Sequence, residues 1–192
     1  MAGLACALGA CGGSSSPTKT TFTSTASYST LLNAGVHLLR QGNSSAAEQL
    51  FQQAIAKDPG GAVAHFDLGV IYQGAGERAD ALRQYQQALR VDSHYARALF
   101  NEAVLLAPHN AALAIYYYRQ VVSIQPDSPT ALLNLGLLEN ETKSLHARAV
   151  LDLRAAVKLD PSLRARIPAP LSRALGPVPR RASNASSHPK RG

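Results

Sequence analysis

The side chains best suited to catalysis or metal binding are scattered along this sequence. Its six histidines are His37, His65, His94, His109, His146 and His188. No two of them stand at the spacing that places two metal ligands on one face of a helix. No nucleophile elbow or phosphate-binding loop is present, and acidic pairs such as Glu139 and Glu141 are interpreted as a solvated helix face. We therefore expect a non-enzyme with no catalytic residues, no metal site and no cofactor.

The composition favours a helical protein, and the charge is concentrated at one end. Ala and Leu dominate, aromatic residues make up only 6% of the chain, and Trp is absent, which favours helix over strand. The formal net charge of +7 arises wholly after residue 161, in a segment without acidic residues. Its basic residues are Arg164, Arg166, Arg173, Arg180, Arg181, Lys190 and Arg191. The preceding part is neutral and lacks the basic stripe of a nucleic-acid-binding domain, so no nucleic-acid partner is expected for it. No apolar run approaches the length of about 18 residues that predicts a transmembrane helix.

Comparison of the sequence with itself reveals four tandem segments of about 34 residues. They span residues 28–61, 62–95, 96–128 and 129–163. Each contains an amphipathic stretch, a turn, a second stretch, and a stop such as Asp58-Pro59 or Asp160-Pro161. Proline pushes the residue before it out of the helical region, so the second helix of such a segment must end there. The pattern predicts four helix–turn–helix repeats.

A fixed order of large and small side chains recurs in these segments. In the second segment it reads His65, Leu68, Gly69, Tyr72, Ala81, Tyr85 and Ala88. This order resembles the signature of the tetratricopeptide repeat family, in which small residues let paired helices approach and large ones fill the gaps between neighbours. His65 stands at a large-residue position, so we interpret it as a core residue. The third segment has Glu102-Ala103 in place of the Leu-Gly pair, and the fourth has Glu139 at the Tyr-like position.

The resemblance implies an all-α fold, a right-handed α-solenoid of four helix–turn–helix repeats in which each pair buries its apolar face only against its neighbours. Residues 164–176 are expected to supply a capping helix, with Leu171, Ala174 and Leu175 on one face. We expect disordered segments at both ends, with residues 1–27 a leader and flexible linker and residues 177–192 a basic tail. Two roles stay open for this tail, a solubilising one and contact with a polyanion.

The first helices of such stacks line a concave groove, and the resemblance identifies the positions that face it. These positions carry Leu32, Asn33, Val36, Phe66, Asp67, Val70, Phe100, Asn101, Val104, Leu133, Asn134 and Leu137. The apolar members predict a groove floor that binds a peptide segment, and the alternative is that superhelical curvature buries them as ordinary packing. The amides of Asn33, Asn101 and Asn134 can both donate and accept hydrogen bonds. They predict a ladder along a bound peptide backbone, but Asn is also common at this position without a ligand.

The first eleven residues are apolar apart from glycine spacers and end in Leu8-Gly9-Ala10-Cys11. This ending resembles the bacterial lipobox, whose cysteine becomes the lipidated N-terminus, and the Ser/Thr-rich stretch after it resembles a flexible tether. No Lys or Arg precedes the apolar run, which is short for a signal peptide. Two explanations stay open: the sequence begins inside a longer signal peptide, or the segment is an Ala/Gly-rich leader. The other cysteine, Cys6, also lies here, so no disulfide is expected in the repeats.

Two hypotheses for the function follow. In the first, the chain is a protein–protein interaction scaffold that is lipidated at Cys11, anchored on the extracytoplasmic side of the cell envelope, and binds an unidentified protein or peptide segment in its groove. In the alternative, it is a cytoplasmic adaptor whose basic tail contacts RNA or another polyanion.

Overall fold

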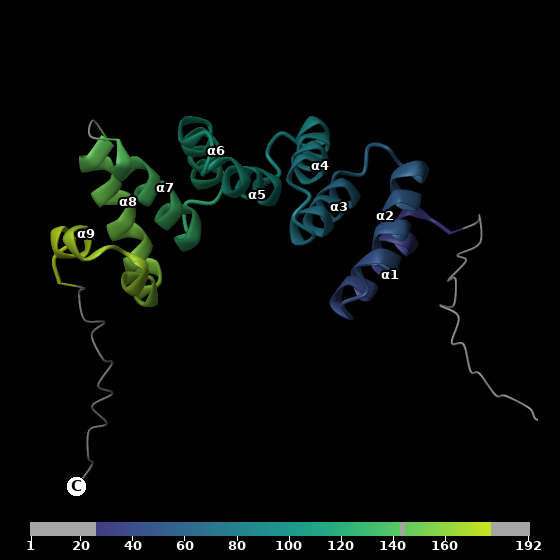
Figure 1. Cartoon of the computed structure of the whole chain (residues 1–192), viewed down its shortest axis with the longest axis horizontal. Coiled ribbons are helices and arrows are strands. Elements are labelled where there is room, and N and C mark those ends of the chain that lie inside the picture. The colour runs from purple at the N-terminus through teal and green to yellow at the C-terminus, as the bar shows by residue number, and fades with distance from the viewer. Residues whose placement is uncertain (1–25, 143–144, 178–192) are drawn as a thin grey trace, which may run out of the picture.

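The chain folds into a row of helix pairs, seen in a computed structural model that describes residues 26–142 and 145–177 (Figure 1). The helices are α1 (Tyr28–Arg40), α2 (Ser44–Lys57), α3 (Ala62–Gly74), α4 (Arg78–Val91), α5 (Ala96–Leu106), α6 (Ala111–Ile124), α7 (Pro129–Glu141), α8 (His146–Leu159), the 3₁₀ helix η2 (Pro161–Arg166) and α9 (Ala169–Ala174). Each helix packs mainly against its immediate neighbours in the chain, and α1 and α9 lie at opposite ends of the row. The expected all-α solenoid of four helix pairs is confirmed.

Two of the sequence expectations concern segments outside the described residues. They are the lipidation of Cys11 in the leader and the disorder of the basic tail. Within residues 26–142 and 145–177, no helix has both the length and the apolar character needed to cross a bilayer.

The ends of the helices follow from local chemistry. Gly42 and Gly76, in the turns after α1 and α3, both have φ of +79°, a left-handed conformation that glycine adopts without a steric penalty. The side chain of Asn43 caps α2 by accepting a hydrogen bond of 3.2 Å from the backbone N–H of Ala46. Asp58 is extended, with φ of −140°, and α2 ends there, one residue before Pro59.

Close contact between the two helices of a pair depends on a small residue in the first helix. A Cβ atom on Gly69 of α3 would lie 2.6 Å from ring atom Cε1 of Tyr85 in α4, so only glycine lets these helices approach this closely. The Tyr85 ring is fully buried and lies 5.7 Å, centroid to centroid, from the ring of Phe66. His65 is buried too, and its Nδ1 lies 2.9 Å from Oε1 of Gln84. The interpretation of His65 as a core residue is therefore confirmed.

The last repeat is covered by the segment that follows it. Four apolar residues of this segment pack against α7 and α8; they are Leu163, Ile167, Leu171 and Leu175. Ala174, expected on the same face, is exposed. The guanidinium of Arg154 in α8 donates to the carbonyl oxygens of Ala174, at 2.9 Å, and Leu175, at 3.3 Å. Residues 161–175 thus bury the apolar face that α8 would otherwise expose.

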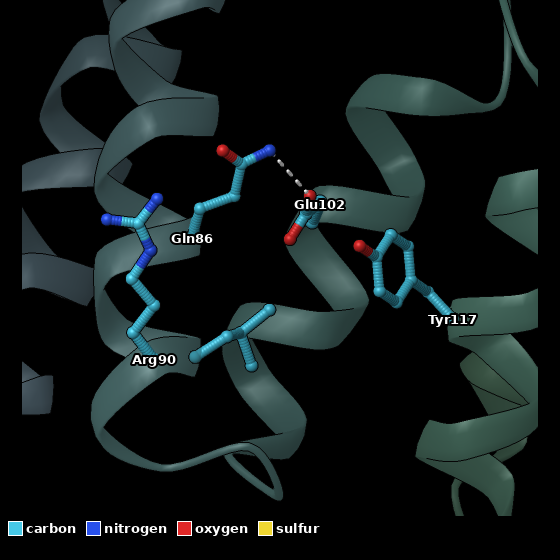
Figure 2. A pocket seen from close by; sticks show the side chains of 5 residues that line it. Gln86, Arg90, Glu102 and Tyr117 are labelled. Carbon is cyan, nitrogen blue, oxygen red and sulfur yellow. Dashed lines mark hydrogen bonds between the residues drawn. The ribbon is translucent and has the colours of Figure 1, made fainter.

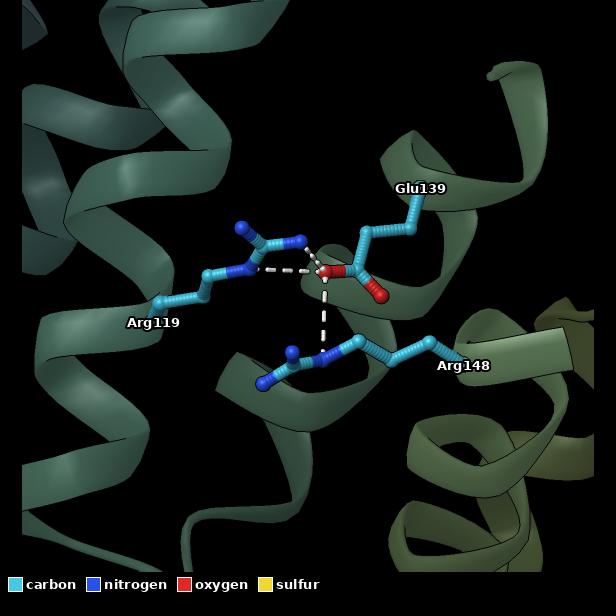
Figure 3. A network of polar contacts seen from close by, with 3 residues as sticks. All are labelled: Arg119, Glu139 and Arg148. Carbon is cyan, nitrogen blue, oxygen red and sulfur yellow. Dashed lines mark hydrogen bonds and ion pairs between the residues drawn. The ribbon is translucent and has the colours of Figure 1, made fainter. Parts of the chain in front are cut away.

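The contact between the third and fourth repeats contains a buried acid (Figure 3). Glu139 of α7 is fully buried, and its Oε1 accepts from Nε of Arg119 at 2.9 Å and from Nη2 of the same residue at 2.6 Å. Nε of Arg148, in α8, lies 3.7 Å from the same oxygen. The interpretation of Glu139 as part of a solvated face is wrong, because the side chain points between helices instead of away from them.

A second carboxyl group, that of Asp152 in α8, adjoins Glu139. Neither Oε2 of Glu139 nor Oδ2 of Asp152 has a hydrogen-bond partner among the described residues, and both atoms are buried. Burial and the neighbouring Glu139 carboxylate raise the pKa of Asp152 to about 6, with Arg148 and Arg119 acting in the opposite direction. Folding therefore favours the protonated form of the Asp152 carboxyl group.

Candidate functional site

The first helices of the second, third and fourth repeats form a pocket of about 460 Å³. Its lining comes from α3, α5, the end of α6 and the start of α7, and consists of Phe66, Val70, Ala96, Arg97, Phe100, Asn101, Val121, Gln125, Ser128 and Thr130. Apolar and aromatic side chains line it together with amide, hydroxyl and guanidinium groups. This combination is typical of sites that bind a small ligand or a few side chains of a peptide.

The structure places the predicted groove residues unequally. Phe66 and Leu133 are buried in the core, with 3% and 0% of their surface exposed. The other apolar members are half-buried; they are Leu32, Val36, Val70, Phe100, Val104 and Leu137. Leu32 and Val36 pack against the core of the first repeats, and Leu137 against that of the last. The pocket brings together only Phe66, Val70, Phe100 and Asn101 of the predicted set. The apolar strip is therefore accessible in its middle, not along its whole length.

Arg97 is the charged group of this pocket. Its side chain is exposed, and its guanidinium carbon lies 4.3 Å from the centroid of the Phe66 ring, a cation–π contact that holds it over the pocket. Tyr95 packs edge-on against the other side of this cluster, with its ring centroid 5.3 Å from that of Phe66. The nearby Asp67 is buried, and burial raises the pKa of its carboxyl group while Arg97 acts in the opposite direction.

The predicted asparagine ladder has a structural role in two repeats. Nδ2 of Asn101 donates to the hydroxyl oxygen of Tyr85 at 3.1 Å, and Nδ2 of Asn134 donates to that of Tyr118 at the same distance. Each bond joins the first helix of one repeat to the second helix of the repeat before it. It also fixes the orientation of the amide and uses one of its two N–H donors.

The other two members of the ladder differ. Asp67 follows a repeat that has Phe51 where the second and third repeats have Tyr85 and Tyr118, and phenylalanine offers no hydroxyl group. Asn33, in the first helix of the first repeat, is exposed. The ladder thus consists of two anchored amides, one buried acid and one exposed amide.

A second pocket, of about 300 Å³, was not predicted from the sequence (Figure 2). It lies between α4 and α6, over α5, and is lined by Gln86, Leu89, Arg90, Glu102 and Tyr117. Glu102 is 1% exposed, and its Oε1 accepts a hydrogen bond of 3.2 Å from Nε2 of Gln86. Burial raises the pKa of Glu102, and Gln86 and Tyr117 act in the opposite direction. The presence of Glu102 at the Leu-Gly position of the repeat was the signal that could have revealed this site.

No group of three or more His, Cys, Asp or Glu side chains is arranged to hold a metal ion in the described part of the chain. The two pockets offer hydrogen-bonding groups, apolar surface and single charges.

Comparison with known proteins identifies tetratricopeptide repeats in this sequence. Residues 38–99 match the family model described as tetratricopeptide repeat. The type IV pilus assembly protein PilF of Pseudomonas aeruginosa is 30% identical over 115 residues, which cover 58% of this chain and 46% of PilF. The chain thus spans about half the length of this curated relative.

Two solved structures share the fold. A crystal structure of MamA superposes with a TM-score of 0.62 at 24% identity, covering 73% of this chain and 81% of MamA. The structure of MamA from Desulfovibrio magneticus RS-1, from residue 41 to its end, gives a TM-score of 0.64 at 19% identity and covers 72% of this chain and 78% of that one. Repeat signature, helix arrangement and comparisons agree: the chain carries tetratricopeptide repeats, matched directly over residues 38–99, in an α-solenoid fold.

Proposed function

We propose that this protein is an envelope adaptor, lipidated at Cys11, that binds an extended segment of a partner protein in the pocket between α3, α5 and α7. The observation that carries the proposal is the lining of this pocket. Val70 and Phe100 leave apolar surface accessible, and Arg97 is held beside it by its contact with Phe66. A pocket of about 460 Å³ is large enough for one or two side chains of a bound segment.

The polar groups of the pocket suit the backbone of an extended segment. The Asn101 side chain is fixed by its bond to Tyr85, so its amide is oriented before a ligand arrives. An amide with a fixed orientation loses less side-chain entropy on binding than a mobile one. Its remaining donor and its oxygen can pair with the C=O and N–H of a bound peptide.

The proposed membrane tether is supported by the sequence of the leader and by the name of the similar protein PilF. The lipobox-like Leu8-Gly9-Ala10-Cys11 is followed by a Ser/Thr-rich stretch that ends where α1 begins. PilF is a type IV pilus assembly protein by its name, which supports an envelope machine as the place where this chain binds its partner. The extracytoplasmic face of the membrane is then the location of the repeats.

The groove is tested by a double substitution, Val70→Gln with Arg97→Ala. Val70 is half-buried at the edge of the core and Arg97 is exposed, so this change should disturb the helices less than a change at the buried Phe66. We expect partner capture by cross-linking from native membranes to fall at least about tenfold, which corresponds to about 1.4 kcal/mol. The matched control is Tyr116→Ala, an exposed residue of α6 outside both pockets. Unchanged capture with unchanged circular dichroism would refute the groove proposal.

The tether is tested by metabolic labelling with a fatty acid. We expect label in the natural chain and in Cys6→Ala, and none in Cys11→Ala. An unlabelled natural chain in the soluble fraction would refute the tether and favour the cytoplasmic adaptor, whose basic segment after residue 161 would then be tested for RNA binding.

A further inference from the structure

The furrow between the second helices of neighbouring repeats holds a buried glutamate at two successive places. Between α4 and α6 the acid is Glu102, from α5. Between α6 and α8 it is Glu139, from α7. The two glutamates are 1% and 0% exposed. A carboxylate removed from water in this way is stable only if charge and hydrogen bonds replace the lost hydration.

The furrow over α7 shows how this protein satisfies such an acid. Arg119 of α6 places two N–H groups on Oε1 of Glu139 (Figure 3). Gln86 of α4 stands at the same position in its helix as Arg119, counted from the first residues Arg78 and Ala111. The groups that interact with Glu102 here, the amide of Gln86 and the hydroxyl group of Tyr117, are both neutral (Figure 2). Arg90 also lines this furrow, but its guanidinium donates to Gln87. Among the described residues, the acid over α5 therefore has no ion pair of the kind that Arg119 makes with Glu139.

One oxygen of Glu102 is left without a partner at the pocket. Its Oε2 is buried and has no hydrogen-bond partner among the described residues. The pocket of about 300 Å³ lies beside this carboxylate, with Leu89 as an apolar wall. Two other walls, Gln86 and Arg90, are exposed side chains, and such side chains change rotamer on a short timescale. The carboxylate can thus be reached without opening the helix pair.

We propose that this pocket receives a lysine or arginine side chain from the surface of a partner protein, whose cation pairs with Glu102. The methylene stem of such a side chain fits against Leu89 while its charged end reaches the carboxylate. Arg90 is hydrogen-bonded to Gln87 at 3.5 Å, and it must move aside for the incoming cation. This surface is separate from the groove between α3, α5 and α7, and the inference does not depend on the proposed function.

The test uses the full chain labelled with ¹³C and ¹⁵N and a small probe, Nα-acetyl-arginine methylamide. Its matched control is the citrulline analogue, which has nearly the same shape and no charge. We expect the arginine probe to shift the side-chain carboxyl resonance of Glu102 and the backbone amide of Tyr117, and the citrulline probe to leave both unchanged. Two variants define the site. Glu102→Gln removes the charge, and Gln86→Arg places a cation of the chain's own at the helix position that Arg119 occupies.

Both variants should weaken binding of the arginine probe at least about tenfold, and Glu141→Gln, at an exposed acid of α7, should leave it unchanged. Gln86→Arg keeps the test decisive even if Glu102→Gln disturbs folding, because Gln86 is exposed. Equal shifts with citrulline, or full binding in Gln86→Arg, would overturn the proposal. A response that appears only when Arg180 and Arg181 are both replaced by glutamine would assign the pocket to this chain's own basic segment and would also overturn it.

Discussion

Asp152→Asn is expected to stabilise the protein at neutral and alkaline pH. The Asp152 carboxyl group lies against the fully buried Glu139, and one oxygen of each is buried without a hydrogen-bond partner among the described residues. Ionising both groups places two negative charges together, and Arg119 and Arg148 offset this only in part. An asparagine amide has nearly the same shape, carries no charge, and can donate to Oε2 of Glu139.

The size and sign of the effect follow from the pKa of Asp152. This pKa rises from 3.8 to about 6 on folding, so the folded chain binds more protons than the unfolded chain between about pH 4 and pH 6. The free energy of unfolding therefore falls as the pH rises through this window. Above about pH 6 the full destabilisation caused by ionised Asp152 is present. This increase in pKa corresponds to a destabilisation of about 3 kcal/mol at most. Asp152 is only half-buried, and solvent screening reduces the expected cost to about 1–2 kcal/mol.

The assay is urea unfolding followed by circular dichroism at about pH 5 and pH 8. The natural chain should lose stability between these values, and Asp152→Asn should gain about 1–2 kcal/mol over it at pH 8 with a smaller difference at pH 5. Asp127→Asn, at an exposed acid of the turn before α7, is the control and should change little. A less stable Asp152→Asn at pH 8, or a variant that keeps the natural pH dependence, would refute the reasoning.

Two further predictions concern the packing of the repeats. Gly69→Ala should destabilise the chain by about 1–3 kcal/mol in urea unfolding, because the added Cβ would lie 2.6 Å from the buried Tyr85 ring. Gly74→Ala, with open space around its Cβ position, is the control. An equal loss of stability in both variants would contradict the packing argument. Tyr118→Phe should cost about 1 kcal/mol by removing the hydroxyl that accepts from Asn134, whereas Tyr116→Phe, 58% exposed, should have almost no effect. A neutral Tyr118→Phe would mean that this hydrogen bond contributes nothing to the contact between repeats.

The fold could be predicted because the repeat is a local pattern copied four times. Pro59, Gly42 and Gly76 end helices through their own backbone preferences, and these need no knowledge of distant contacts. The small residue at Gly69 likewise marks where two helices cross closely. Such signals recur at the same place in several segments, so each supports the others.

The candidate site was harder to predict because exposure depends on neighbouring repeats. Phe66 and Phe100 occupy the same repeat position, yet Phe66 is buried and Phe100 is half-buried. Phe66 is covered by Tyr95 and Arg97, whose placement is set by the next repeat. Glu139 was misjudged for a different reason. Its acidic character suggested a solvated face, but Arg119 of the neighbouring α6 pairs with it inside the helix stack, and this partner lies 20 residues away in the sequence.

The placement of the two pockets around α5 has a thermodynamic consequence. The consecutive residues Asn101 and Glu102 line different pockets, and α5 has only 11 residues. A ligand that binds in one pocket and displaces the short helix α5 would alter the shape of the other pocket. By thermodynamic linkage, a ligand in one pocket then changes the affinity of the other pocket by a certain factor. A ligand in the other pocket changes the affinity of the first by the same factor. Two partner segments that both displace α5 would then not bind independently, and the coupling free energy would measure the strength of this effect.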